Sequence, residues 1–151
     1  MRKRNGNLQL AFDPYGPAVF LLIMLPNVLW LLWPAPRDIL RSASATPILD
    51  GAASAFQAVM VAASCIVYGR ERRPLSKPAF AGIAAAVLFY FAAWAFYYAG
   101  VTAPPVILTL CAAPCLAFLF LAAARKNAIS FCAAAVFAVC HTLSGLINFI
   151  L

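Results

Sequence analysis

The side chains with the greatest capacity for chemistry in this sequence are one histidine and a few amides and hydroxyls within long apolar stretches. His141, Ser144 and Asn148 recur at intervals of three and four residues, which places them on one face of a helix. Asn27 lies near the middle of the first apolar stretch, and Gln57 lies ten residues beyond the proline that opens the second. Because lipid offers no hydrogen bonds, all five side chains are expected to face inward.

We predict that Asn27, Gln57 and His141 form one polar cluster, with Ser144 and Asn148 on the same helix face as the histidine. Two interpretations stay open at this point. The cluster is either a set of structural contacts between helices, or a ligand-binding pocket or pathway formed by these five residues.

Five cysteines offer a second kind of chemistry. Cys111 and Cys115 are one helical turn apart, and together with Cys140 and His141 they are weak candidates for a soft-metal site. Their spacing is not that of a zinc site, and the sequence contains no C-x-x-C motif. Cysteine is also a common small buried residue, so we expect these thiols to pack in the core, with no metal and no cofactor.

Charged residues, which usually mark chemistry inside a membrane, are missing from the interior of every apolar stretch. Asp50 lies close to the start of the second stretch, where the dipole of a helix favours a negative charge. No nucleophile, base and acid can be named as a set. No catalytic residue is therefore predicted, and an enzyme is less favoured than a binding or structural protein.

The composition shows what must position these side chains. Of the 151 residues, 66% are hydrophobic and 10% are charged, whereas soluble domains are about half apolar and a quarter charged. Roughly 100 apolar residues are enough for about five membrane helices of some 20 residues each. Such a chain is not a soluble enzyme, a nucleic-acid-binding domain, a disordered protein or a secreted disulfide scaffold.

The apolar stretches predict an all-α, polytopic transmembrane helical bundle that forms one domain over residues 1–151. Runs of alanine favour helices over the alternating strands of a β-barrel. Thr46 and Asn127 are candidate N-caps of the second and fifth helices, and Gly100 separates the third helix from the fourth. Pro26 is expected to interrupt the first helix. The predicted spans cover residues 17–33, 47–68, 78–98, 104–124 and 128–150.

Small residues one turn apart predict where helices approach each other, because association in lipid depends on close packing. The pairs are Gly51/Ala55, Ala81/Ala85, Gly82/Ala86 and Ala113/Ala117.

Basic residues predict the orientation, since short cytoplasmic loops are rich in lysine and arginine. Arg37 and Arg41 fall on one side of the predicted membrane, close to two acids. The other bases all fall on the opposite side, together with the N-terminus, which is therefore expected to be cytoplasmic with the C-terminus outside. These bases are Arg2, Lys3, Arg4, Arg70, Arg72, Arg73, Lys77, Arg125 and Lys126. The aromatic residues expected at the outer interface are Trp30, Trp33, Trp94, Tyr97 and Tyr98.

Three short motifs resemble those of a group of small, uncharacterised five-helix integral membrane proteins from bacteria. They are Pro26-Asn27 in the first span, Pro114 with Phe118-Leu119 in the fourth, and Phe137-x-x-x-His141 in the fifth. Members of that group often carry a Glu and a Gly-Arg pair early in the second helix, where this chain has Asp50-Gly51 and no arginine. The resemblance implies the architecture and no particular activity.

These observations predict a multi-pass protein of the cell membrane, most simply a non-enzymatic small membrane subunit or scaffold. The first alternative is a small-molecule binding or transport protein with its pocket around Asn27, Gln57 and His141. The second alternative is a membrane enzyme or a thiol or metal protein. The expected partners are the lipid bilayer and anionic lipid at the basic cytoplasmic loops, with a membrane-protein partner or a homo-oligomer as further candidates. Nucleic acid is not expected to bind.

Overall fold

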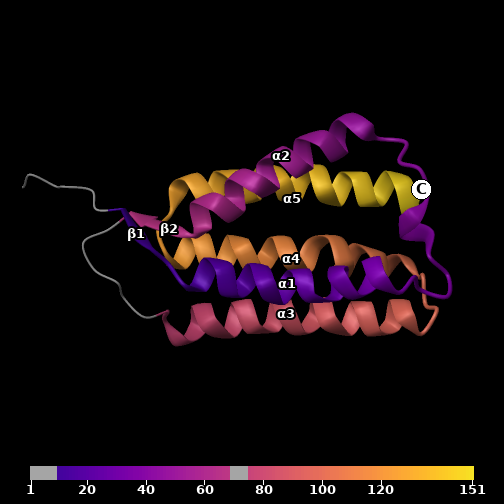
Figure 1. Ribbon diagram of the computed structural model, residues 1–151, viewed down its shortest axis with the longest axis horizontal. Coiled ribbons are helices and arrows are strands. Elements are labelled where there is room, and N and C mark those ends of the chain that lie inside the picture. Colours follow the sequence, from indigo (N-terminus) through magenta and orange to yellow (C-terminus); the bar gives the residue numbers. More distant parts are fainter. Residues whose placement is uncertain (1–9, 69–74) are drawn as a thin grey trace, which may run out of the picture.

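Five long helices make up most of the molecule in the computed structural model, which describes residues 10–68 and 75–151 (Figure 1). All five are long and apolar enough to cross a membrane. The structure therefore confirms a five-helix, all-α protein with helices of membrane-spanning length. The helices are α1 (Tyr15–Leu32), α2 (Pro47–Ser64), α3 (Lys77–Tyr98), α4 (Pro104–Ala124) and α5 (Ala128–Phe149).

Two short strands at one end of the bundle are not predicted from the sequence. β1 (Leu10–Phe12) pairs antiparallel with β2 (Ile66–Tyr68). As a result α2 ends at Ser64, and the prediction of a helical span to residue 68 is wrong by four residues. Residues 66–68 are as apolar as the helix before them, but they are β-branched or aromatic and have a partner strand, which hydropathy alone does not reveal.

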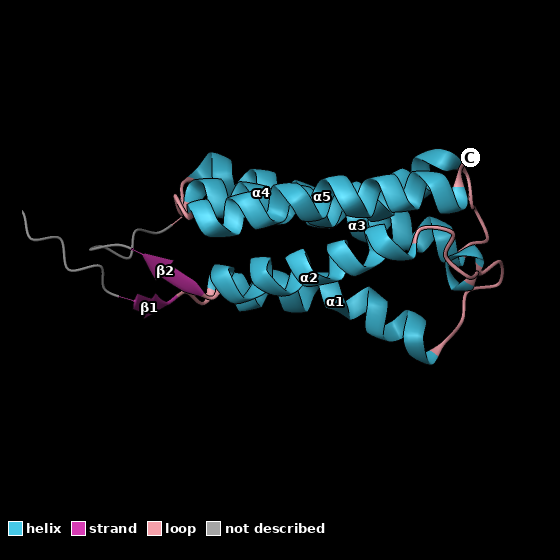
Figure 2. Ribbon diagram, turned by 90° about the horizontal axis from the view of Figure 1, so that it is seen from above, coloured by secondary structure: helices cyan, strands magenta, loops and turns pink. Residues whose placement is uncertain are grey.

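The helices form two layers (Figure 2). In one layer α3, α4 and α5 lie in a row, with α4 in the middle as the most buried helix. In the other layer α2 packs closely along α5, whereas α1 contacts α2, α3 and α4 over only a few residues each. This loose packing of α1 leaves room between the layers.

α1 is continuous through Pro26, so the prediction of an interruption there is wrong. A proline removes only one backbone donor from a helix. The Asn27 side chain adds a hydrogen bond at the same place, because its Nδ2 donates to the carbonyl of Ile23 at 2.8 Å. A full break would leave more backbone groups unpaired in an apolar environment, so the helix continues.

The turns between the helices contain the residues that the sequence assigns to them. Gly100 ends α3 in the left-handed conformation with a φ of 83°, which glycine adopts without strain. Asn127 is the N-cap of α5, and its Oδ1 accepts the N–H of Ser130 at 3.0 Å. Its Nδ2 also donates to the carbonyls of Ala63 and Ile66, at 2.8 and 3.1 Å, which ties the start of α5 to the end of α2.

Only some of the predicted small-residue pairs lie at helix contacts. Ala113 and Ala117 are buried in α4, and Gly82 lies against an aromatic ring of that helix. In an alanine-rich helix small residues also face outward, so their spacing alone does not identify the contact face. The exposed pairs are Gly51/Ala55 and Ala81/Ala85.

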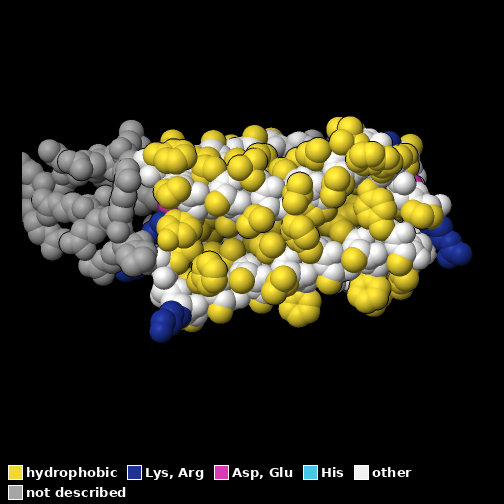
Figure 3. Space-filling model, turned by 60° about the horizontal axis from the view of Figure 1, so that its bottom comes forward, with side chains coloured by type: hydrophobic (Ala, Val, Ile, Leu, Met, Phe, Trp, Pro, Cys, Tyr) yellow, Lys and Arg dark blue, Asp and Glu magenta, His cyan; other side chains and the backbone are white. Residues whose placement is uncertain are grey.

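The outer surface of the bundle is apolar between its two ends. Figure 3 shows one face on which hydrophobic side chains cover the middle of the molecule, with lysine and arginine side chains at either end. Leu21, Leu88 and Val139 are each at least 60% exposed. Water does not favour a contiguous apolar surface of this size, so the exposed surface agrees with five membrane-spanning helices.

Candidate functional site

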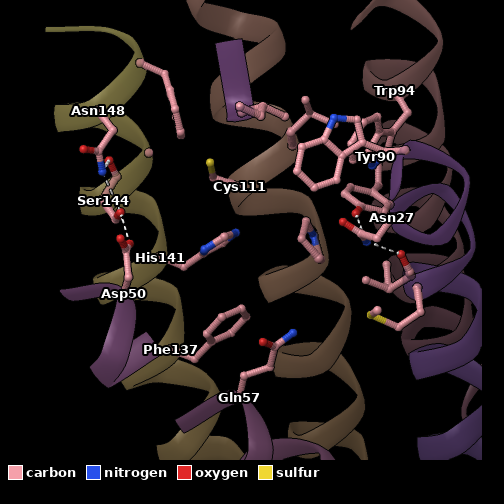
Figure 4. A pocket seen from close by; sticks show the side chains of 18 of the residues that line it. Asn27, Asp50, Gln57, Tyr90, Trp94, Cys111, Phe137, His141, Ser144 and Asn148 are labelled. Atoms are coloured by element: carbon pink, nitrogen blue, oxygen red, sulfur yellow. Dashed lines mark hydrogen bonds between the residues drawn. The ribbon is translucent and has the colours of Figure 1, made fainter. Parts of the chain in front are cut away.

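A cavity of about 480 Å³ lies between the two layers, and all five helices contribute to its wall (Figure 4). Most of the wall is apolar, and much of it is aromatic. The aromatic side chains are Trp30, Tyr90, Trp94, Phe118, Phe137 and Phe149.

All five ligand-binding candidates from the sequence lie in this wall. Asn27 comes from α1, Gln57 from α2, and the three residues of the polar face from α5, namely His141, Ser144 and Asn148. The cavity is therefore the place where these side chains face inward, as their polarity in an apolar bundle requires.

Ser144 and Asn148 hold the first turn of α2 against α5. The Ser144 hydroxyl donates to the Asp50 carboxylate, and Asn148 Nδ2 donates to Thr46 Oγ1 at 2.7 Å. Asn148 Oδ1 also accepts the N–H of Ala45 at 2.6 Å. Thr46 is the N-cap residue of α2 as predicted, but its hydroxyl faces α5 and makes no cap bond to the α2 backbone.

Asn27 lies across the cavity from this group, beside Tyr90 (Figure 4). Its Nδ2 donates to Tyr90 Oη at 2.6 Å. The Tyr90 ring in turn packs edge-on against Trp94, with 6.3 Å between ring centroids. Asn27 therefore joins α1 to the aromatic wall of α3.

His141 and Gln57 line the cavity between these two groups. The His141 ring stacks on Phe137, with 5.0 Å between centroids and 16° between planes. Within residues 10–68 and 75–151, neither the His141 ring nitrogens nor the Gln57 amide has a hydrogen-bond partner. These two side chains offer polar atoms that the described protein does not itself use.

Asn27, Gln57 and His141, predicted to form one polar cluster, line one cavity but are not joined to one another by hydrogen bonds. Asn27 binds Tyr90 on one side of the cavity, and the α5 residues Ser144 and Asn148 bind the start of α2 on the other. Helical spacing correctly groups residues of one helix. It does not show that a cavity separates α1 from α5.

The connection between α1 and α2 covers part of the cavity and includes a short 3-10 helix, η1 (Ile39–Arg41). Asp38 fixes it, because its carboxylate accepts Trp30 Nε1 and the Tyr97 hydroxyl, each at 2.9 Å, and Arg41 Nε at 2.7 Å. Burial by itself raises the pKa of Asp38, but these three hydrogen bonds together outweigh burial and lower the pKa below its usual value. The connection residues that line the cavity are Leu40, Ser42 and Ser44.

This arrangement corrects the interpretation of two aromatic residues as interface anchors. Trp33 is 65% exposed, as an anchor would be. Trp94 and Tyr97 are buried and pack edge to face, with 5.6 Å between ring centroids. They face inward because Trp94 lines the cavity and Tyr97 donates to Asp38.

The four weak metal candidates are not brought together. Among the residues that the structure describes, no group of three or more His, Cys, Asp and Glu side chains could hold a metal ion. Cys115 Sγ instead donates to the Cys111 carbonyl at 3.1 Å, and Cys111 Sγ packs closely against Gly145. Cys140, on α5, is half-buried.

Asp50 is the site residue that sequence analysis missed. It lies in the first turn of α2, lines the cavity and is bound by Ser144. The sequence did contain a signal, since Asp50 is an acid inside a predicted span, three residues after the opening proline. Its proximity to the helix start accounts for the acid without a functional role, so the signal is not specific.

The described basic residues fall at both ends of the bundle. Lys77, Arg125 and Lys126 lie at the end that contains the strands, and Arg37 and Arg41 lie in the α1–α2 connection at the other end (Figure 1). The remaining predicted cytoplasmic bases lie outside the described residues: Arg2, Lys3, Arg4, Arg70, Arg72 and Arg73.

Comparison of the chain with family models, curated proteins and solved structures finds no match to any of them.

Proposed function

We propose that this chain is a multi-pass protein of the cell membrane that binds a small molecule in the cavity between its helices. The observation that carries the proposal is the cavity itself. Its volume of about 480 Å³ lies within the range of roughly 300–1,000 Å³ that is typical of small-molecule sites, and its wall combines apolar and aromatic surface with a few polar groups.

The polar groups of the wall support binding over a purely structural role. Ser144 and Asn148 have protein partners and hold helices together, as a scaffold requires. His141 and Gln57 have no hydrogen-bond partner among the described residues, although both face the cavity (Figure 4). A membrane subunit or scaffold, the simplest function from the sequence, gives no reason for a large cavity with two such side chains.

The cavity can be tested through the thiol of Cys111, which lines it. In single-cysteine variants we expect a small methanethiosulfonate reagent to modify Cys111 and 2-phenylethanol to slow that reaction at least fivefold, because the bound probe occupies the cavity. Cys115, one turn away, is buried like Cys111 but does not line the cavity, so it is expected to react at least tenfold more slowly. The measurement is the rate of modification by mass spectrometry.

Exposed Cys132 is the reagent control, since its reaction should not respond to the probe. If Cys111 is as unreactive as Cys115, or if no small aromatic probe slows its reaction, the proposal of a ligand cavity is wrong.

We further propose that the N-terminus is cytoplasmic and the C-terminus external, because nine of the eleven bases of the chain fall on one side of five spans. Alkaline phosphatase fused after Leu151 is expected to be active and green fluorescent protein at the same point dark. Fusions in the α4–α5 turn, after Lys126, should give the opposite result. The reverse pattern at both points would show that the orientation is inverted.

A further inference from the structure

Asp50 differs from the other acids that the structure describes in having no lysine or arginine partner; the titratable side chain that interacts with it is His141. Asp13 pairs with Arg125, and Asp38 pairs with Arg41, each with a shortest N–O distance below 3 Å. No ion pair of Asp50 is found within residues 10–68 and 75–151. Its carboxylate contributes a negative charge to the cavity wall that no lysine or arginine side chain balances there.

The surroundings of Asp50 keep that charge in place without neutralising it. The Ser144 hydroxyl donates to the carboxylate, and the N-terminal turn of α2 stabilises a negative charge through the helix dipole. Both are neutral contributions, so they favour the ionised acid and leave room for a counter-ion.

Two further polar side chains of the cavity wall can accept hydrogen bonds from such a counter-ion. His141 has an acceptor nitrogen when it is neutral, and Gln57 has a carbonyl oxygen. Neither side chain has a hydrogen-bond partner among the described residues. The aromatic side chains of the wall, Tyr90 and Trp94 among them, can contact an apolar body and attract a positive charge over their faces.

We infer that the ligand is a protonated organic amine with an apolar or aromatic body, whose ammonium group pairs with Asp50. This inference rests on the proposed ligand cavity and adds the chemical class of the ligand. An anion would bind less tightly, because the Asp50 carboxylate would repel it. A neutral molecule of the same shape would also bind less tightly than the amine, because it would leave the carboxylate without a counter-ion.

The test compares three probes of similar size against the full-length protein in detergent micelles: 2-phenylethylamine, 2-phenylethanol and phenylacetate. The readout is again the slowing of Cys111 modification, at about pH 8, where histidine with its usual pKa near 6.5 is neutral. We expect the concentration that halves the rate of Cys111 modification to be at least tenfold lower for the amine than for the alcohol. Phenylacetate is expected to slow the modification least.

Asp50→Asn provides the matched variant, because asparagine can still accept the Ser144 hydrogen bond but carries no charge. It is expected to reduce protection by the amine at least tenfold and to change protection by the alcohol less than twofold, which also shows that the cavity is intact. Asp38→Asn removes an acid that is already paired with Arg41, so it should keep the preference for the amine.

The outcomes separate the two proposals. If no probe protects Cys111, the ligand cavity itself is refuted. If the alcohol protects as well as the amine, or if Asp50→Asn keeps the preference for the amine, the cavity stands and the inference of an amine ligand is wrong.

Discussion

Replacement of Asp13 by alanine is expected to lower the free energy of unfolding by about 3 kcal/mol, the typical cost of removing one member of a buried ion pair. The side chain of Asp13 is 1% exposed and that of Arg125 is 11% exposed. Asp13 Oδ2 lies 2.6 Å from Arg125 Nε, and Asp13 Oδ1 accepts a hydrogen bond from Arg125 Nη2 at 2.8 Å, so the two groups form a close, hydrogen-bonded ion pair.

The pair stabilises the bundle because it joins three segments that are distant in the sequence. Asp13 donates its N–H to the carbonyl of Cys65 at 2.9 Å and accepts the N–H of Tyr15 at 3.2 Å, so it links the start of α1 to the end of α2. Arg125 belongs to the turn after α4, and its guanidinium lies 4.6 Å from the centroid of the Tyr15 ring.

Reversible unfolding in mixed micelles measures this effect. Arg125→Met should cost about as much as Asp13→Ala, since either change leaves the opposite charge buried with its main partner gone. The double variant should be less destabilised than the sum of the two, because no unpaired charge remains. Lys126→Met removes an exposed base of the same turn and should change stability by less than about 0.5 kcal/mol. Additive effects of Asp13→Ala and Arg125→Met would contradict the role given to the pair.

The second large effect is expected at Gly16, where alanine should destabilise the protein by about 1–3 kcal/mol, as overpacking typically does. Gly16 is in the first turn of α1, and a Cβ on it would collide with the backbone carbonyl oxygen of Ser64. Backbone cannot rotate away as a flexible side chain can, so α1 and the end of α2 would have to separate. Asp13 and β1 lie just before this contact and would move with α1.

Gly51→Ala is the matched control for Gly16→Ala. Both positions are helical, but nothing lies within 4 Å of the place where a Cβ of Gly51 would be. The control should therefore be neutral or stabilise the helix by up to about 1 kcal/mol, as alanine does relative to glycine in a helix. Equal effects of the two substitutions in the same unfolding measurement would show that the close approach of α1 to α2 does not matter for stability.

Much of the fold can be predicted from the sequence, because in lipid the local sequence of each segment determines whether it forms a helix. A backbone group in an apolar environment must bond within its own helix, so each long apolar stretch becomes a helix whatever its neighbours are. The span at 104–124 agrees with the helix in full, and Gly100 and Asn127 mark the ends of helices as predicted. The same argument places Asn27, Gln57 and His141 on inward faces, since lipid does not satisfy their hydrogen bonds.

The sequence could not supply the contacts between segments far apart in the chain. Residues 66–68 continue the apolar pattern of α2, and only their pairing with β1 ends the helix at Ser64. From the sequence, Asp50 is an ordinary acid at the start of a helix. In the structure Ser144 of α5 binds its carboxylate, and Asp50 lines the cavity. From the sequence alone, Trp94 and Tyr97 are expected to be interface anchors. In the structure the α1–α2 connection brings Asp38 to Tyr97, and Trp94 lines the cavity.

The sequence by itself thus determined five apolar helices, their order and the inward direction of the polar side chains, because these depend on the periodicity and hydropathy of single segments. The tertiary structure alone decided which faces meet, which of the described acids stays unpaired and where a cavity remains. These depend on side-chain shape and on distances between helices, and periodicity within one helix contains no information about either.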